Sequence, residues 1–255
     1  MSAAHGRAAG LMRGRLRPRH YAAIALVLLI GLPLLWLALA YGGLPRLWSH
    51  HEHRKMGDRA GEMISYTAQD IPGDPLNLRL SGSAAAIDCA FTRAGWSRAD
   101  PLSLNSSLRI ARSVIGGDPY PNAPVSPLYV ADRQQDLAFE LDEGTSARKR
   151  HHVRLWSTGP DQWIGAASFD KGVGLSLFTL QITHRIGPDL DAERSRVGAL
   201  VIAAGGHPVG VTSARLHQWH RNGGGDRYYS DGEIAAFALP AVCPPRALDQ
   251  SPHTQ

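Results

Sequence analysis

The segment 150–156 (Arg-His-His-Val-Arg-Leu-Trp) carries the densest set of side chains that could do chemistry. Successive side chains of a β-strand point to opposite faces. Alternation therefore places four of these side chains on one face: Arg150, His152, Arg154 and Trp156. Two guanidiniums beside an imidazole can bind a phosphate or carboxylate group through bidentate hydrogen bonds. The structural alternative is a charged face whose arginines pair with acids on the preceding strand, such as Asp136 and Glu140.

Two further histidines fall on faces that the pattern makes apolar. His151 alternates with Val153 and Leu155, so we expect a hydrogen-bonded core histidine. His184 alternates with Leu180, Ile182 and Ile186, which places it on the apolar face of its own strand.

A zinc site would need three protein groups around one point, and His152, His184 and Asp170 are the available set. Because His152 lies on a polar face and His184 on an apolar one, we expect the two histidines to be separated. The sequence therefore predicts no metal and no cofactor. Phe169-Asp170-Lys171-Gly172-Val173-Gly174 is a glycine-bearing turn after a strand and lacks the pattern of a phosphate-binding loop.

A predicted helix at 189–204 places an arginine on its inward face. One helical stripe contains three apolar residues and this arginine: Leu190, Arg194, Val197 and Val201. A buried guanidinium requires a carboxylate or a bound anion, and Glu193 is adjacent in sequence. Asp189 and Asp191 suit the capping of the helix N-terminus.

The elements that position these residues alternate between two periodicities. Period-two alternation predicts strands at 76–80, 128–131, 136–141, 150–156, 162–170, 178–186, 209–218 and 228–239. Helical spacing predicts helices at about 83–94, 104–115 and 189–204. Helices that come early and strands that follow in sequence predict an α+β domain with a mostly antiparallel sheet and about three helices.

Residues 21–41 contain no charge and match the roughly 20 residues that cross a bilayer as a helix. Five arginines and no acid precede this segment, which favours a cytoplasmic N-terminus and a domain on the extracytoplasmic side of the plasma membrane. A cleaved signal peptide is the alternative, since Ala38-Leu39-Ala40 resembles a cleavage site, although signal segments are usually shorter. The formal net charge of +5 belongs to this basic flank, so the domain is neutral and nucleic-acid binding is excluded.

These features divide the chain into five segments. They are a basic cytoplasmic tail (1–20), a transmembrane helix (21–41), a linker (42–73) with a His50-His51-x-His53 cluster, an α+β domain (74–240) and a disordered tail (241–255). The two cysteines, Cys89 and Cys243, could form one bridge outside the cytoplasm, or be unrelated.

Several segments in consistent order resemble the LssY C-terminal domain family. They are Gly73-Asp74-Pro75-x-Asn77-Leu78, Ala94-Gly95-Trp96, 123–129 (APVSPLY), 135–139 (QDLAF), 150–156 (RHHVRLW), Ile182-Thr183-His184, 191–194 (DAER) and Ser230-Asp231-Gly232. The family is named after a proposed type I secretion component, and the resemblance implies a membrane-proximal domain but no particular reaction. In longer members this domain follows a multi-spanning membrane region that looks like a lipid-phosphatase or scramblase-type module. Neither that region nor its Lys-x6-Arg-Pro and Ser-Gly-His signatures is found here.

Two functions follow from the residues. The first is a non-enzymatic, membrane-anchored envelope module that binds an anionic small ligand or an envelope protein through Arg150, His152, Arg154 and Arg194. The alternative is a hydrolase for a phosphate or ester, with catalytic candidates His152, His184, Asp170 and Asp191. Convergence of these side chains in one cleft would distinguish the enzyme from the binding module.

Overall fold

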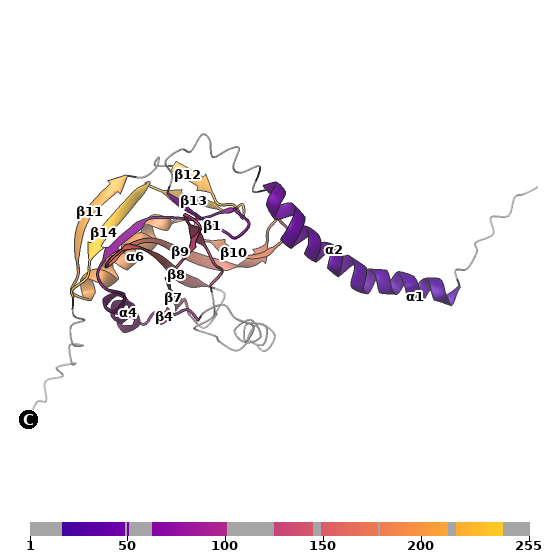
Figure 1. The fold of residues 1–255 in the computed structure, drawn as a ribbon, viewed down its shortest axis with the longest axis horizontal. Coiled ribbons are helices and arrows are strands. Elements are labelled where there is room, and N and C mark those ends of the chain that lie inside the picture. The colour runs from indigo at the N-terminus through magenta and orange to yellow at the C-terminus, as the bar shows by residue number, and fades with distance from the viewer. Residues whose placement is uncertain are drawn as a thin grey trace, which may run out of the picture.

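The computed structural model describes residues 17–48, 50, 63–100, 125–144, 149–177, 179–213 and 218–241. Figure 1 shows a long N-terminal helix that projects from a β-rich domain. The domain is α+β with mostly antiparallel pairing, as predicted. The predicted helix at 104–115 and nearly all of the 241–255 tail lie outside the described residues.

The N-terminal helix runs from Pro18 to Trp48. Its successive parts are α1 (Pro18–Leu26), the π-helical η1 (Val27–Gly31), α2 (Leu32–Ala38) and the π-helical η2 (Leu39–Gly43). Pro33 lacks an N–H, so the local hydrogen-bond ladder must adjust just before it, where η1 lies. The helix is long and apolar enough to cross a membrane, a property that signal sequences share.

The domain end of the helix contacts the globular domain. The indole Nε1 of Trp48 donates a hydrogen bond to the carbonyl oxygen of Gly223, at 2.9 Å. Part of the predicted linker at 42–73 is helical. Its last residues belong to the domain, because β1 (Ile64–Tyr66) and the start of β2 (Pro72–Pro75) lie within that range.

The main sheet has the strand order β11-β14-β3-β9-β8-β7-β4, and β10 also pairs with β9. The bounds are β3 (Leu78–Ser81), β4 (Ser97–Arg98), β7 (Leu137–Asp142), β8 (Arg150–Gly159), β9 (Gln162–Leu175), β10 (Ile182–Ile186), β11 (His207–Ser213) and β14 (Glu233–Ala238). Among these described strands, only β14 and β3 pair in parallel. The long β8–β9 hairpin forms the centre of the sheet and supplies most of the polar residues considered below.

Two helices pack on one face of this sheet. These are α4 (Ala84–Arg93), capped by the Ser83 hydroxyl, and α6 (Leu190–Ala203), capped by the Asp189 carboxylate. Their apolar stripes form a core with the sheet that includes Phe91, Phe139, Val153, Leu155, Val197 and Val201. The predicted helical phases and the assignment of Val153 and Leu155 to the core are therefore confirmed.

A second, small sheet contributes to burial of residues on the other face. Its order is β2-β1-β5-β6, with β5 at Tyr129–Val130 and β6 at Arg133–Gln134. A smaller apolar cluster contains Leu76, Leu128, Trp156, Ile164 and Ala166. Residues on both faces of the central strands are therefore buried, and this decides the environment of the polar residues on β8.

The C-terminal strands are shorter than predicted. The segments expected to be strands at 209–218 and 228–239 instead supply β11, β14 and a separate hairpin of β12 (Gln218–Arg221) and β13 (Arg227–Ser230). Gly232 interrupts the second segment, because its φ of +79° is a conformation that suits glycine and breaks strand geometry.

Candidate metal centre

The register of the central strands places the predicted polar residues on one face. Arg150, His152, Arg154 and Trp156 share that face, as predicted, and all four are buried. In β9, Asp170 lies opposite Arg150, and in β7, Glu140 lies opposite His152. Directly opposite residues of an antiparallel pair share a face of the sheet. The carboxylates of Asp170 and Glu140 thus lie in the same buried layer as the histidine and the arginines.

β10 adds His184 to this layer. Ile186 lies opposite Asp170, and His184 lies opposite Val173 across an irregularity in the register. The expected separation of His152 and His184 is therefore wrong. β10 is shorter than the strand predicted at 178–186, since it begins at Ile182 and leaves Leu180 outside. His184 nevertheless contacts Asp170 and so lies on the same face of the sheet as the polar residues of β8. Polarity did not distinguish the faces, because residues on both sides are buried.

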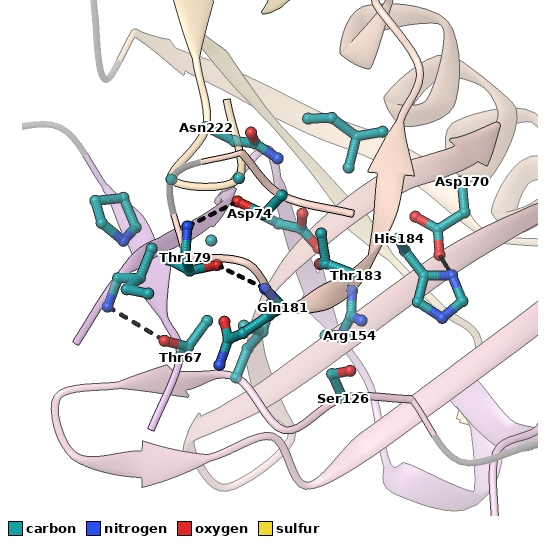
Figure 2. Close-up of a pocket in the computed structure, with 18 residues that line it drawn as sticks. Thr67, Asp74, Ser126, Arg154, Asp170, Thr179, Gln181, Thr183, His184 and Asn222 are labelled. Atoms are coloured by element: carbon teal, nitrogen blue, oxygen red, sulfur yellow. Dashed lines mark hydrogen bonds and ion pairs between the residues drawn. The ribbon is translucent and has the colours of Figure 1, made fainter. Parts of the chain in front are cut away.

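Three side chains converge at this point. Asp170 Oδ2 lies 2.6 Å from His152 Nε2 and 2.8 Å from His184 Nδ1. The two imidazole rings are 6.2 Å apart and nearly perpendicular, at 83°. Ligand-type atoms of all three residues lie within 4.8 Å of one another. In Figure 2 the His184 ring and the Asp170 carboxylate point toward each other.

The distances of 2.6 and 2.8 Å are short enough for charge-assisted hydrogen bonds between each imidazole and the carboxylate. Within the described part of the chain, however, neither His152 Nε2 nor His184 Nδ1 has a hydrogen-bond partner of good geometry. Buried polar atoms are normally satisfied by a partner, water or an ion. Two imidazole nitrogens gathered around one carboxylate oxygen are the types of donor that divalent metals prefer.

The charge state of Asp170 suits this donor set. Burial by itself raises the pKa of this carboxyl, but the neighbouring His152 and His184 outweigh burial and hold the pKa below its ordinary value. Asp170 is therefore an ionised carboxylate at neutral pH. Its negative charge would stabilise a cation held by the two imidazoles.

Glu140 supports His152 from the opposite side. Its Oε1 faces His152 Nδ1 at 3.5 Å, and its Oε2 accepts a hydrogen bond from Arg150 at 2.5 Å. Burial raises the pKa of Glu140, while the charges of His152 and Arg150 lower it in part. A carboxylate at one imidazole nitrogen that leaves the other nitrogen for the metal is a common outer-shell arrangement. Glu140 had been considered only as a partner for the arginines.

A cavity of about 120 Å³ opens in front of Asp170 and His184. Its other walls include Asp74, Ser126, Arg154, Thr179, Thr183 and Gly223. They belong to β2, the segment before β5, β8, the β9–β10 connection, β10 and the turn after β12, and Figure 2 shows the labelled Asp74, Ser126, Arg154, Thr179 and Thr183. His152 is almost completely buried behind Asp170, whereas the His184 side chain is 41% exposed and forms part of the cavity wall.

The arginines of this layer are already paired. Arg154 donates to Asp74 Oδ2 at 2.6 Å, and Ser168 donates to the same oxygen at 3.2 Å. The structural interpretation of the charged face is thus confirmed for Glu140 with Arg150, whereas Asp136 instead pairs with Arg133. Asp74 was not predicted as a site residue. Its only sequence signal was its place in the Gly73-Asp74-Pro75 motif.

Two of the candidate residues lie in a different cluster. Arg194 is buried, as predicted, and makes two bonds of 2.6 Å to the carboxylate of Asp231, with further contacts to Asp191 and the Glu233 carbonyl. None of these residues lines the cavity. Asp191 and Arg194 therefore do not join His152, His184 and Asp170.

The carboxylate beside Arg194 in sequence has another partner. Glu193 Oε2 lies 2.7 Å from His151 Nδ1, within the helix-covered core. The prediction of a hydrogen-bonded core histidine at position 151 is therefore confirmed. His151 and His152, although adjacent in sequence, belong to opposite sides of the sheet.

Comparison with known proteins gives a family for the domain. The family model described as the LssY C-terminus matches residues 59–234, which contain β1 to β13 and all the residues of the convergent site. No curated protein and no solved structure matched the chain. The match covers more than half of the chain, and the chain therefore belongs to the LssY C-terminal domain family.

Proposed function

We propose that the domain holds a divalent metal ion through His152, Asp170 and His184 and uses it to hydrolyse a small phosphate or ester group. The observation that carries this proposal is the convergence of three ligand atoms, two of which belong to residues that line a cavity, Asp170 and His184. Catalytic metal sites commonly use three protein ligands and leave one position for water or substrate. The cavity in front of His184 provides room for both.

The types of ligand also limit which metal ions suit the site. Two histidines and one carboxylate suit zinc, and the same set suits non-haem iron. A metal of this kind lowers the pKa of a bound water and so supplies hydroxide near neutral pH. Around it, the Glu140 carboxylate behind His152 would hold that ligand in place, while the hydroxyls of the cavity would position an anionic group.

The competing proposal is an anion-binding or envelope-partner module that uses Arg150, His152, Arg154 and Arg194 without a metal. In the structure these arginines pair with Glu140, Asp74 and Asp231, respectively. Each guanidinium is thereby largely neutralised, so the layer carries little surplus positive charge for a ligand. The pairing favours the metal-dependent function over the metal-free one.

The chain is proposed to be a single-pass membrane protein whose globular domain lies outside the cytoplasm. The apolar helix and the arginine-rich segment before it support this orientation. Cys89 is disulfide-bonded, which is typical of an oxidising compartment; the second cysteine, Cys243, lies outside the described residues.

Elemental analysis of the full-length chain tests the proposed metal. The protein would be purified in detergent without a His tag, in a background where His50, His51 and His53 are replaced by alanine to remove the adventitious cluster. We expect one equivalent of zinc or iron in this parent and little in His152→Ala or Asp170→Asn. His207→Ala, an exposed histidine on β11, is the control and should keep the metal. A metal-free parent, or full occupancy in His152→Ala, would overturn the proposal.

A further inference from the structure

The cavity lies beside the domain end of the apolar helix. Trp48, near the domain end of that helix, donates a hydrogen bond to the Gly223 carbonyl, and Gly223 is itself part of the cavity wall. Asn222 and Gly224 of the same turn also line the cavity. Figure 1 shows β10, which carries His184, on the side of the domain that faces the helix, and β11 on the opposite side.

The length of the helix places this contact relative to a bilayer. The uncharged residues 21–41 span about 30 Å, which matches the hydrocarbon thickness of a membrane. The chain continues as a helix from Leu44 to Trp48, so Trp48 lies about 10 Å beyond Tyr41 along the axis. The headgroup layer on each side is about 5–8 Å thick. The Trp48–Gly223 contact, and the cavity wall with it, therefore lies at the outer edge of the headgroups.

The rim of the cavity has the surface expected at such an interface. The β9–β10 connection supplies Ser176, Thr179 and Gln181 to the cavity. Leu177 of this connection and Leu175, the last residue of β9, are exposed at the surface. The Leu177 side chain is 83% exposed. Outside the lining itself, on the strand β12 that leads into the Asn222–Gly224 turn, the exposed Trp219 has the Arg227 guanidinium 5.2 Å from its ring centre. Exposed leucine and tryptophan beside basic residues are typical of segments that insert into a membrane interface.

From these observations we infer that the cavity receives the phosphorylated headgroup of a lipid from the membrane in which the chain is anchored. The cavity of about 120 Å³ has room for a small polar group but is smaller than the roughly 300 Å³ at which sites for drug-sized ligands begin, so the acyl chains would stay in the bilayer. Its hydroxyl and amide groups can donate hydrogen bonds to phosphate oxygens. This inference rests on the proposed function and names its substrate class.

Depth-dependent quenching tests the position of the cavity rim. The full-length chain would carry Leu177→Cys with an environment-sensitive fluorophore, since Cys89 is already disulfide-bonded. It would be reconstituted into vesicles of phosphatidylethanolamine and phosphatidylglycerol that contain lipid with a nitroxide on its headgroup. Val211→Cys on β11 is the matched control, because Val211 is also apolar and 59% exposed. We expect several-fold stronger quenching at position 177 than at position 211. Equal quenching, or none at 177, would overturn the inference.

A second measurement distinguishes a lipid from free phosphate. Photoactivatable phosphatidic acid in the same vesicles should crosslink to the segment 171–186, and millimolar inorganic phosphate should reduce this crosslinking little. Complete competition by inorganic phosphate would identify free phosphate as the ligand and overturn the lipid assignment, as would crosslinks confined to other segments. The quenching experiment does not require the metal, so we expect it to be unchanged in His152→Ala. A failure of the membrane inference is thereby separable from a failure of the metal site.

Discussion

Replacement of Arg194 by methionine should destabilise the domain far more than the same change at Arg196. The Arg194 side chain is 10% exposed and makes two bonds of 2.6 Å to Asp231. Methionine keeps most of the volume but leaves Asp191 and Asp231 near each other without their cation. Arg196, two residues later, is 48% exposed and lies 3.8 Å from Glu193. Comparing the two variants therefore separates the effect of losing the buried guanidinium from the general effect of losing an arginine on α6.

The magnitude follows from the burial of the partners. Removing one member of a buried ion pair costs about 3–5 kcal/mol. Asp191 and Asp231 are partly exposed, so solvent would reduce the loss to about 2–3 kcal/mol for Arg194→Met, against about 0.5 kcal/mol or less for Arg196→Met. At about 2–4 °C per kcal/mol for a domain of this size, Tm should fall by about 4–12 °C in the first variant. Thermal unfolding of the full-length proteins in detergent, followed by circular dichroism, measures both. Equal Tm values for the two variants would show that the pairing of Arg194 with Asp231 is not the source of stability.

The same pair predicts a dependence on pH. Hydrogen bonds from Arg194 lower the pKa of Asp231 from 3.8 to about 2. Because the folded pKa lies below the unfolded value, the stabilisation is complete above about pH 4 and is lost as the pH falls toward about 2. The difference in Tm between the parent and Arg194→Met should therefore shrink across this interval. A difference that stays constant down to about pH 2 would contradict the pairing.

Three further predictions address the metal site, the core and the topology. Glu140→Gln should weaken metal binding by about 10–100-fold in chelator competition, because the amide cannot replace the carboxylate beside His152, whereas the exposed Glu143→Gln should have no effect. Gly198→Ala should lower the free energy of unfolding by about 1–3 kcal/mol in denaturant titrations, because a Cβ there would lie 2.5 Å from Phe237 Cζ; an unchanged midpoint would show that α6 shifts freely. Reporter fusions at Gln255 should be active only with an extracytoplasmic reporter, and activity only from a cytoplasmic reporter would reverse the proposed orientation.

The sequence predicts the regular elements of the domain well, because they have strong periodicity. The helix expected at 189–204 is α6, within one residue at each end, and the strand expected at 150–156 begins where β8 begins. The short strands of the small sheet were harder, since segments of two to four residues have no measurable alternation. β2 also contains two prolines, Pro72 and Pro75, which are typical of loops.

The sequence predicted individual residues of the candidate site but not which of them come together. Alternation within β8 correctly placed His152 with Arg150 and Arg154, because that information is local. Joining His152 to His184 requires the register between β8, β9 and β10, and an irregularity between Arg185 and Ile186 is part of that register. The polarity of the residues did not show which face of the main sheet is exposed, because the small sheet helps to bury the polar side. Asp74 comes from a strand far away in sequence and could be placed only by the fold.

The position of β14 has a consequence for how the chain reaches its native state. This strand is among the last in sequence, yet it lies between β11 and β3 and pairs Ala235 with Leu78. Until Glu233–Ala238 is available, both β3 and β11 would present an unpaired edge, the kind of surface that promotes aggregation. A chain with such non-local pairing folds slowly, and its N-terminal strands cannot complete the sheet while synthesis continues. In the orientation proposed above, the domain would therefore close only after its C-terminal strand had also crossed the membrane.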